Sequence, residues 1–455
     1  MKLQFANSIN KFGGVLLLSL AAAFVMPVAV DKAFESVGFD SQLVEDANAQ
    51  SKRAKRKLPG ISESFFKKLG KISDLASPPE EEKRKPDFQG AIKALKKMEK
   101  DCGADKCNEY EKAQIYNYFG WIYYSVEDYN NSIKYYELVV NQAPHIPWGL
   151  ELQVMYTLVQ LEFSQERYSN ALKRLDQWMK LSETIGADVY NLRASICYQM
   201  DDKNCALKSI KTAVKMVEDK GKVAKEAWYS LERALYLEKE DYKSSLPVLV
   251  KLVRHYPKHS YYQQMGSVYG MLEKEKSQLA ILDSTYIMGG LAKEQQLLNL
   301  SYLMIQSDYP YRAAKILDKG IKGKVIKRSE KNLETLAKAW GMSQEKKKAI
   351  PYMTEAAKLS KKGDLYGVLM GLYLDVDDSK SAIKAGRDAI KKGELKRPGE
   401  INLNIGIAYF ELKNFDDSIK YLKKAAKYEK TQRFALRWIK HVEREQARAE
   451  QLAAS

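Results

Sequence analysis

Residues 113–144 read AQIYNYFGWIYYSVEDYNNSIKYYELVVNQAP, and this stretch decides the fold. Its first half spaces an aromatic, an apolar, a glycine and a tyrosine residue at Tyr116, Phe119, Gly120 and Tyr123. Its second half spaces a small, an aromatic, an apolar and a proline residue at Ser132, Tyr136, Val139 and Pro144. Apolar residues at helical spacing give a helix one buried stripe, a small residue lets two backbones approach, and proline cannot continue a helix. The stretch therefore predicts a helix–turn–helix.

The same spacing recurs along the chain. With the first copy starting at Ala113, further copies start at Leu152, Ala187, Glu226, His259, Glu294, Glu330, Gly363 and Gly399. The last copy is the clearest and carries Ile405, Gly406, Tyr409, Ser418, Leu422 and Ala425. A helix–turn–helix of about 34 residues with these offsets matches the tetratricopeptide repeat. One copy buries too little surface to fold alone, so the recurrence is what makes the assignment specific.

The repeat predicts the fold class and the domain organisation. We expect an all-α tetratricopeptide-repeat superhelical solenoid of about ten helix-turn-helix units with a C-terminal capping helix. Residues 61–112 should form an irregular N-terminal repeat with an insertion at 77–86, residues 113–430 nine repeats, and residues 431–455 the cap. The cap residues expected to cover the last repeat are Phe434, Trp438, Ile439 and Val442.

The beginning of the sequence carries an export pattern. Lys2 and Lys11 precede an apolar run at residues 13–30, and Ala-Asn-Ala follows at residues 47–49. Positive, then apolar, then Ala-x-Ala is the layout of a secretory signal peptide. We predict that residues 1–49 are this signal and that the solenoid lies outside the cytoplasm. An uncleaved anchor is the alternative, because an apolar run of about 18 residues can just span a bilayer.

Two local cysteine pairs agree with export. Cys102 and Cys107 are close in sequence, and Cys197 ends one predicted helix opposite Cys205 at the start of the next. In an exported protein these pairs predict two disulfides, and four unpaired thiols are the alternative. We expect no metal site, because no His or CxxC motif lies nearby.

The chain is basic, with a formal net charge of +17, and its densest basic run is KRAKRK at residues 52–57. In a cytosolic protein such a run would suggest nucleic acid, which we do not expect for an exported one. We interpret residues 50–60 as a basic, flexible lead-in that contacts anionic lipid headgroups or an acidic partner. A solvated, mobile terminus is the alternative.

The sequence contains no recognisable catalytic motif. HExxH, GxSxG and GxxxxGK[ST] are all absent. His255 and His259 are four residues apart, but Pro257 separates them at a helix end. We therefore expect a protein that is not an enzyme and that binds no cofactor.

Binding of a protein partner is the function that the repeat favours. The inner face of such a solenoid is lined by the first helix of each repeat at offsets 2, 5, 9 and 12. Aromatic or amide residues at these offsets are Asn117, Trp121, Tyr124, Tyr156, Phe163, Asn191, Tyr198 and Tyr302. Such residues suit an extended peptide, whereas packing between repeats is the alternative for each ring. None of the nine copies has Lys or Arg at offset 5, which argues against a clamp for C-terminal carboxylates.

Residues 55–180 also resemble one particular kind of tetratricopeptide-repeat protein. The resemblance rests on KRKLPGISESFFKKLGKI (55–72), DFQGAIKALKKM (87–98), NEYEKAQIYNYFGWIYYSVEDY (108–129), IPWGLELQVMYTLVQLEFSQERYSNAL (146–172) and LDQWM (175–179). These stretches are similar to the exported protein that accompanies TonB–ExbB–ExbD energy-transduction systems in some Gram-negative bacteria. The charged insertion at 77–86 departs from the compact turn expected there.

This resemblance implies a periplasmic scaffold that binds TonB, ExbB or ExbD-type components and supports TonB-dependent uptake across the outer membrane. The alternative is a periplasmic scaffold for cell-wall synthesis or outer-membrane assembly that uses the same groove.

Overall fold

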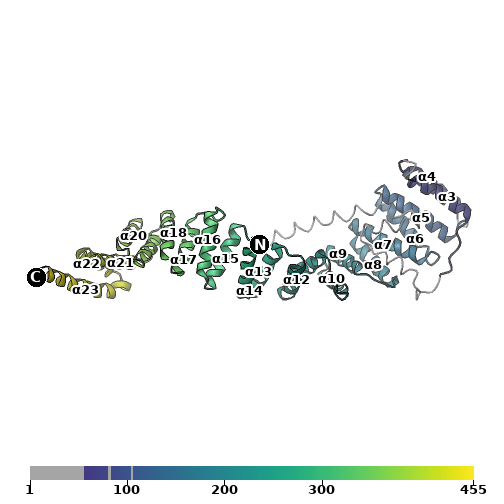
Figure 1. Cartoon of the computed structure of the whole chain (residues 1–455). Coiled ribbons are helices and arrows are strands. Elements are labelled where there is room, and N and C mark those ends of the chain that lie inside the picture. The colour runs from purple at the N-terminus through teal and green to yellow at the C-terminus, as the bar shows by residue number, and fades with distance from the viewer. Residues whose placement is uncertain (1–55, 80–83, 104–105, 455) are drawn as a thin grey trace. The chain divides into compact units, whose positions relative to one another are not determined.

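The computed structural model describes residues 56–79, 84–103 and 106–454. The predicted signal at residues 1–49 lies outside the described residues. All regular secondary structure in the described ranges is helical, as 21 helices labelled α3 to α23 (Figure 1). The predicted all-α helical-repeat fold is therefore confirmed. None of these helices combines the length and apolarity that crossing a bilayer requires.

The backbone divides after Glu240 into two compact units. The helices of unit 1 are α3 (Glu63–Ala76), α4 (Phe88–Cys102), α5 (Glu109–Ser125), α6 (Tyr129–Val140), α7 (Trp148–Ser164), α8 (Tyr168–Leu181), α9 (Ala187–Gln199), α10 (Lys203–Glu218) and α11 (Glu226–Glu238). The helices of unit 2 are α12 (Tyr242–His255), α13 (His259–Met271), α14 (Glu275–Ile287), α15 (Glu294–Gln306), α16 (Pro310–Lys322), α17 (Glu330–Met342), α18 (Lys346–Leu359), α19 (Asp364–Leu374), α20 (Ser379–Lys392), α21 (Pro398–Glu411), α22 (Phe415–Ala425) and α23 (Glu429–Ala454). Odd-numbered helices up to α21 are helix A of a repeat, and even-numbered helices are helix B.

Helices A and B of a repeat approach closely where the sequence places small residues. A Cβ added to Gly120 on α5 would lie 2.6 Å from the Tyr136 ring on α6. The Ser132 hydroxyl donates a hydrogen bond of 2.8 Å to the Gly120 carbonyl across the same contact. In unit 2 the Ser418 hydroxyl donates to the Gly406 carbonyl at the same 2.8 Å. These two pairs explain why the repeat pattern needs Gly on helix A and a small residue on helix B.

The turn between helix A and helix B is built the same way in successive repeats. In the first regular repeat, Glu127 has a left-handed backbone with φ of 62°, and the Asp128 carboxylate then accepts a hydrogen bond from the Asn131 amide. The left-handed residue recurs in later turns at Glu166, Asp201, Glu273, Asp308, Gln344, Asp377 and Lys413. A left-handed residue ends helix A in each of these turns, and at Asp202, Asp378 and Asn414, as at Asp128, a side-chain oxygen also caps the start of helix B.

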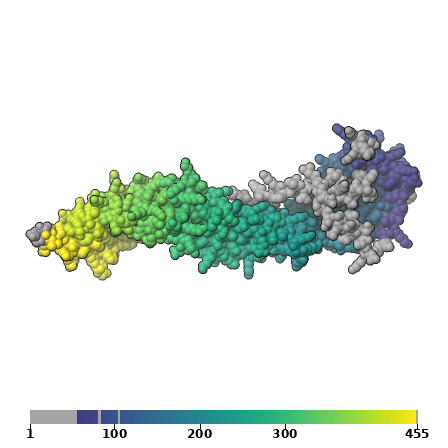
Figure 2. Space-filling view, viewed as in Figure 1, coloured from purple at the N-terminus to yellow at the C-terminus, as the bar shows by residue number. Residues whose placement is uncertain are grey.

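The core is assembled between neighbouring hairpins. In unit 1, one buried cluster joins α3, α4 and α5, a second joins α5, α6 and α7, and a third joins α7, α8 and α9. In unit 2 a continuous cluster runs from Leu291 to Tyr421. Figure 2 shows the repeats of unit 2 stacked in chain order from teal to yellow. Each repeat therefore gains its stability from its immediate neighbours, as in other solenoids.

The last helix, α23, covers the final repeat with a stripe that differs from the predicted one. Ile439 and Val442 are buried and pack with Leu422, as predicted. Phe434 is 58% exposed, so its predicted place in the cap is wrong. The buried stripe is centred on Ala435, Ile439 and Val442, and Phe434 lies one residue, or about 100°, away from it.

Both predicted disulfides are present. Cys102 is bonded to Cys107 and Cys197 to Cys205, with Cα–Cα distances of 5.0 and 5.7 Å. No cysteine in the described part of the chain is free. The first bond closes the link between α4 and α5, and the second joins the end of α9 to the start of α10.

Candidate functional site

Successive A helices of unit 1 share core clusters, α5 with α7 and α7 with α9, and polar contacts join α9 to α11. The Lys225 ammonium lies 2.8 Å from the Asp188 carboxylate, joining the beginnings of α11 and α9. The Tyr198 hydroxyl donates to Glu238 at 3.0 Å and joins their ends. We call the surface formed by Asn117, Tyr124, Tyr156, Phe163, Asn191 and Tyr198 of α5, α7 and α9 the helix-A face.

Trp121 was predicted to line this face, but the structure gives it a packing role. Its side chain is 9% exposed and belongs to the core cluster of α3, α4 and α5. Its ring meets the rings of Phe88 and Tyr118 edge-on, at 6.5 and 6.2 Å. The contact with Phe88 holds α5 against α4, so we leave Trp121 out of the helix-A face.

Three aromatic residues of the helix-A face are half-buried and anchored. Each lies against a ring of helix B in its own repeat: Tyr124 against Tyr129 at 5.8 Å, Tyr156 against Trp178 at 5.2 Å and Phe163 against Tyr168 at 5.6 Å. Burial, and then the nearby Asp188 carboxylate, raise the pKa of Tyr156 to about 12. Its hydroxyl therefore stays neutral at physiological pH. Anchored rings of this kind lose little conformational entropy when a partner binds.

The remaining residues of the helix-A face are polar. Burial, followed by the hydrogen bond to Glu238, raises the pKa of Tyr198 to about 12. Asn117 and Asn191 are both half-buried. Among the described residues, none donates a hydrogen bond to the buried side-chain oxygen of Asn117. Tyr302, which is 36% exposed on α15, belongs to unit 2 and so lies outside this face.

The structure also shows a contact that the sequence did not predict, at the lead-in. Arg56 lies against the start of α7, where its guanidinium is 2.6 Å from the Glu151 carboxylate; these side chains are only 10% and 7% exposed. The same guanidinium donates to the Ile146 carbonyl at 2.8 Å and lies 3.4 Å from the centre of the Trp148 ring. The lead-in was expected to be flexible, but its described part from Arg56 onward is held by the second regular repeat.

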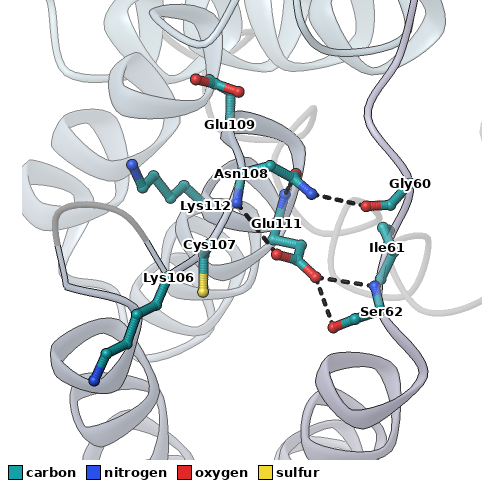
Figure 3. Close-up of a pocket in the computed structure, with 9 residues that line it drawn as sticks. All are labelled: Gly60, Ile61, Ser62, Lys106, Cys107, Asn108, Glu109, Glu111 and Lys112. Carbon is teal, nitrogen blue, oxygen red and sulfur yellow. Dashed lines mark hydrogen bonds between the residues drawn. The ribbon is translucent and has the colours of Figure 1, made fainter.

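The next residues of the lead-in are held by the N-terminal end of α5 (Figure 3). Asn108 donates to the Gly60 carbonyl at 2.7 Å, and the Ser62 amide and hydroxyl both donate to Glu111 at 2.9 Å. A polar cavity of about 700 Å³ lies between this segment and the loop that carries Lys106 and Cys107. We call residues 56–62 the strap. Its partners are 48 (Gly60 and Asn108) to 95 (Arg56 and Glu151) residues away in sequence, so no local pattern could have revealed them.

The described residues contain no group of three or more His, Cys, Asp or Glu side chains that could hold a metal ion. The features that stand out in unit 1 are an aromatic and amide face on the A helices and a strap across the beginnings of α5 and α7.

Comparison with known proteins agrees with the fold. The tetratricopeptide repeat family matches residues 110–145 and 399–432, which are the first and last regular repeats. Two hairpins of the chain thus match the tetratricopeptide repeat, and the described helices form the helical solenoid that its recurrence predicts. No curated protein sequence matches the chain.

Several solved structures are similar to parts of the chain. The crystal structure of MamA protein is 24% identical, with 38% of this chain and 95% of that chain covered and a TM-score of 0.31. The crystal structure of YrrB, described as a TPR protein with an unusual peptide-binding site, is 13% identical, with coverages of 44% and 90% and a TM-score of 0.31. A tetratricopeptide repeat protein from Parabacteroides merdae is 14% identical, with coverages of 56% and 98% and a TM-score of 0.29.

Proposed function

We propose that this protein is an exported tetratricopeptide-repeat scaffold that holds an extended segment of a protein partner in a TonB-dependent uptake system. The observation that carries the binding role is the helix-A face of unit 1. Three of its aromatic rings are anchored by rings of helix B yet remain partly accessible, and α5 and α9 each add one amide side chain to the face. Rings can take side chains of an extended peptide while amides bond to its backbone.

Two features support a place outside the cytoplasm. The sequence begins with a pattern of positive, apolar and small residues that is typical of an export signal. The two disulfides are of the kind that persist in an oxidising compartment such as the periplasm. We therefore place the solenoid in the periplasm as part of the proposal.

The TonB system enters the proposal through sequence resemblance. The stretches that carry it, between residues 55 and 180, fall in the strap and in α3 to α8. Arg56, Trp148 and Glu151, which make the strap contact, all lie within these stretches. The resemblance therefore covers the part of unit 1 where the strap and most of the helix-A face are found. On this proposal the partner is a TonB, ExbB or ExbD-type component.

Site-specific cross-linking in the cell envelope tests the proposal. A photo-reactive amino acid is placed at Asn191 or Tyr124 on the helix-A face, and in a matched variant at Lys97, an exposed position on helix B of the N-terminal repeat. We expect cross-links to TonB, ExbB or ExbD from Asn191 and Tyr124 but not from Lys97. The cross-linked partners are identified by mass spectrometry.

Other results would contradict defined parts of the proposal. Cross-links from Asn191 to proteins of cell-wall synthesis or outer-membrane assembly would refute the TonB assignment and keep the scaffold. TonB-system cross-links from Lys97 alone would keep the system and move the binding surface away from the helix-A face.

A further inference from the structure

A second cavity in unit 1, of about 410 Å³, lies among α8, α9 and α10. Its lining includes Asp176 and Lys180 of α8, Tyr190 and Arg193 of α9, and Lys208 and Thr212 of α10. Successive residues of a helix are about 100° apart, so Arg193 points to the other side of α9 from Asn191 on the helix-A face. We call this cavity the outer pocket. A ligand there would leave the helix-A face free.

The guanidinium of Arg193 is fixed in the outer pocket. Its Nε lies 3.0 Å from an Asp176 carboxylate oxygen, and its Nη1 donates to the hydroxyl of buried Ser209 at 3.1 Å. Neither contact uses Nη2, the third nitrogen of the guanidinium. An arginine side chain that is already positioned in this way loses little conformational entropy when it binds an anion, and the planar guanidinium group suits a carboxylate.

The outer pocket and its surroundings are positively charged. Arg193, Lys180 and Lys208 face a single lining carboxylate, Asp176. Together α8 and α10 carry seven Lys or Arg residues against two acidic ones, and three of the seven, Arg174, Lys203 and Lys215, are paired with carboxylates outside these helices. Lys180 and Lys208 are exposed, and Tyr190 also lines the pocket. This collection of donors is complementary to negative charge.

We propose that the outer pocket docks an acidic segment of a protein partner, with one carboxylate of that segment seated among Lys180, Arg193 and Lys208. The exposed lysines along α8 and α10 contact further carboxylates of the same segment. This inference is independent of the proposed function, because it uses the B helices and a different side of α9. It gives the exposed lysines of α8 and α10 a specific binding role, in contrast to basic residues that are merely solvated.

Fluorescence anisotropy of the full chain with a labelled peptide of alternating Glu and Ala tests the inference. The same peptide with Gln in place of Glu is the control ligand, and we expect it not to bind. Lys180→Glu/Lys208→Glu should weaken binding of the acidic peptide about tenfold, because two attractive contacts become repulsive. The matched variant Lys93→Glu/Lys97→Glu changes the net charge by the same amount at exposed positions of α4, which do not line the outer pocket. It should retain most of the affinity for the acidic peptide.

A second variant separates the pocket from general electrostatics. Thr212→Phe keeps the charge of the protein while filling the cavity, so it should weaken binding of the acidic peptide by a similar factor. Circular dichroism of each variant verifies the helical fold. The inference is overturned if the wild-type chain does not bind the peptide, if the α4 variant loses as much affinity as the α8 and α10 variant, or if Thr212→Phe binds like wild type.

Discussion

The sharpest prediction concerns the strap, where Arg56→Ala should destabilise the N-terminal repeats of unit 1. The substitution removes the 2.6 Å contact to Glu151, the bond to the Ile146 carbonyl and the stacking on Trp148. It leaves the Glu151 side chain, which is only 7% exposed, without its cation. Breaking a buried ion pair from one side typically costs 3–5 kcal/mol. We take the lower end, about 3 kcal/mol, because Glu151 can regain water once the strap has moved.

Hydrogen exchange is the assay that localises this loss. A loss of about 3 kcal/mol should speed exchange of the protected amides of α5 and α7 roughly a hundredfold. Since a solenoid repeat is stabilised by its neighbours, amides of unit 2 should exchange at the wild-type rate in the same sample. Arg167→Ala is the matched control, because this arginine of unit 1 is exposed and its guanidinium donates to the neutral Asn130 side chain. It should cost less than about 0.5 kcal/mol.

A double substitution completes the test. In Arg56→Ala/Glu151→Gln the buried carboxylate is replaced by a neutral amide, so part of the lost stability should return. The reasoning is refuted if the amides of α5 and α7 exchange as slowly in Arg56→Ala as they do in Arg167→Ala. It is also refuted if the double substitution is no more stable than Arg56→Ala, since an unpaired buried Glu151 would then not be the source of the loss.

Three further predictions concern packing, disulfides and pH. Gly120→Ala should lower the free energy of unfolding by about 1–3 kcal/mol in denaturant titrations, because the new methyl group meets the Tyr136 ring at 2.6 Å. The control is Gly371→Ala, which should be neutral or stabilising because a Cβ there would meet no side chain of another described helix within 4 Å. Cys102→Ser/Cys107→Ser should cost about 2 kcal/mol, measured as a lower thermal midpoint, and wild-type protein under reducing conditions should show the same drop in addition to that from Cys197–Cys205. The pKa values of Tyr156 and Tyr198 are raised from 10.0 to about 12, so their stabilising contribution is complete below pH 10 and is lost as the pH rises toward 12. In Tyr198→Phe the free energy of unfolding should decline less over that range than in the wild type, and an equal decline would exclude Tyr198 as a source.

The helical hairpins could be predicted from the sequence because their signals are local. Gly120 and Ser132 are 12 residues apart and meet in one helix–helix contact, as do Gly406 and Ser418. The disulfides were predictable for the same reason, with separations of 5 and 8 residues. Repetition of one local pattern at a nearly constant spacing then fixed the solenoid, since each repeat buries its apolar stripe on its neighbours.

The tertiary structure decided which side chains are covered and by what. An offset within a helix tells which side a residue occupies, but Trp121 packs against Phe88 and Tyr118 while Phe434 stays exposed at the cap. The strap depends on Arg56 meeting Glu151, and the outer pocket depends on three helices of two repeats. Such contacts join residues from different hairpins, and their geometry follows from the stacking of whole repeats. No period in the sequence encodes that stacking at the level of a single side chain.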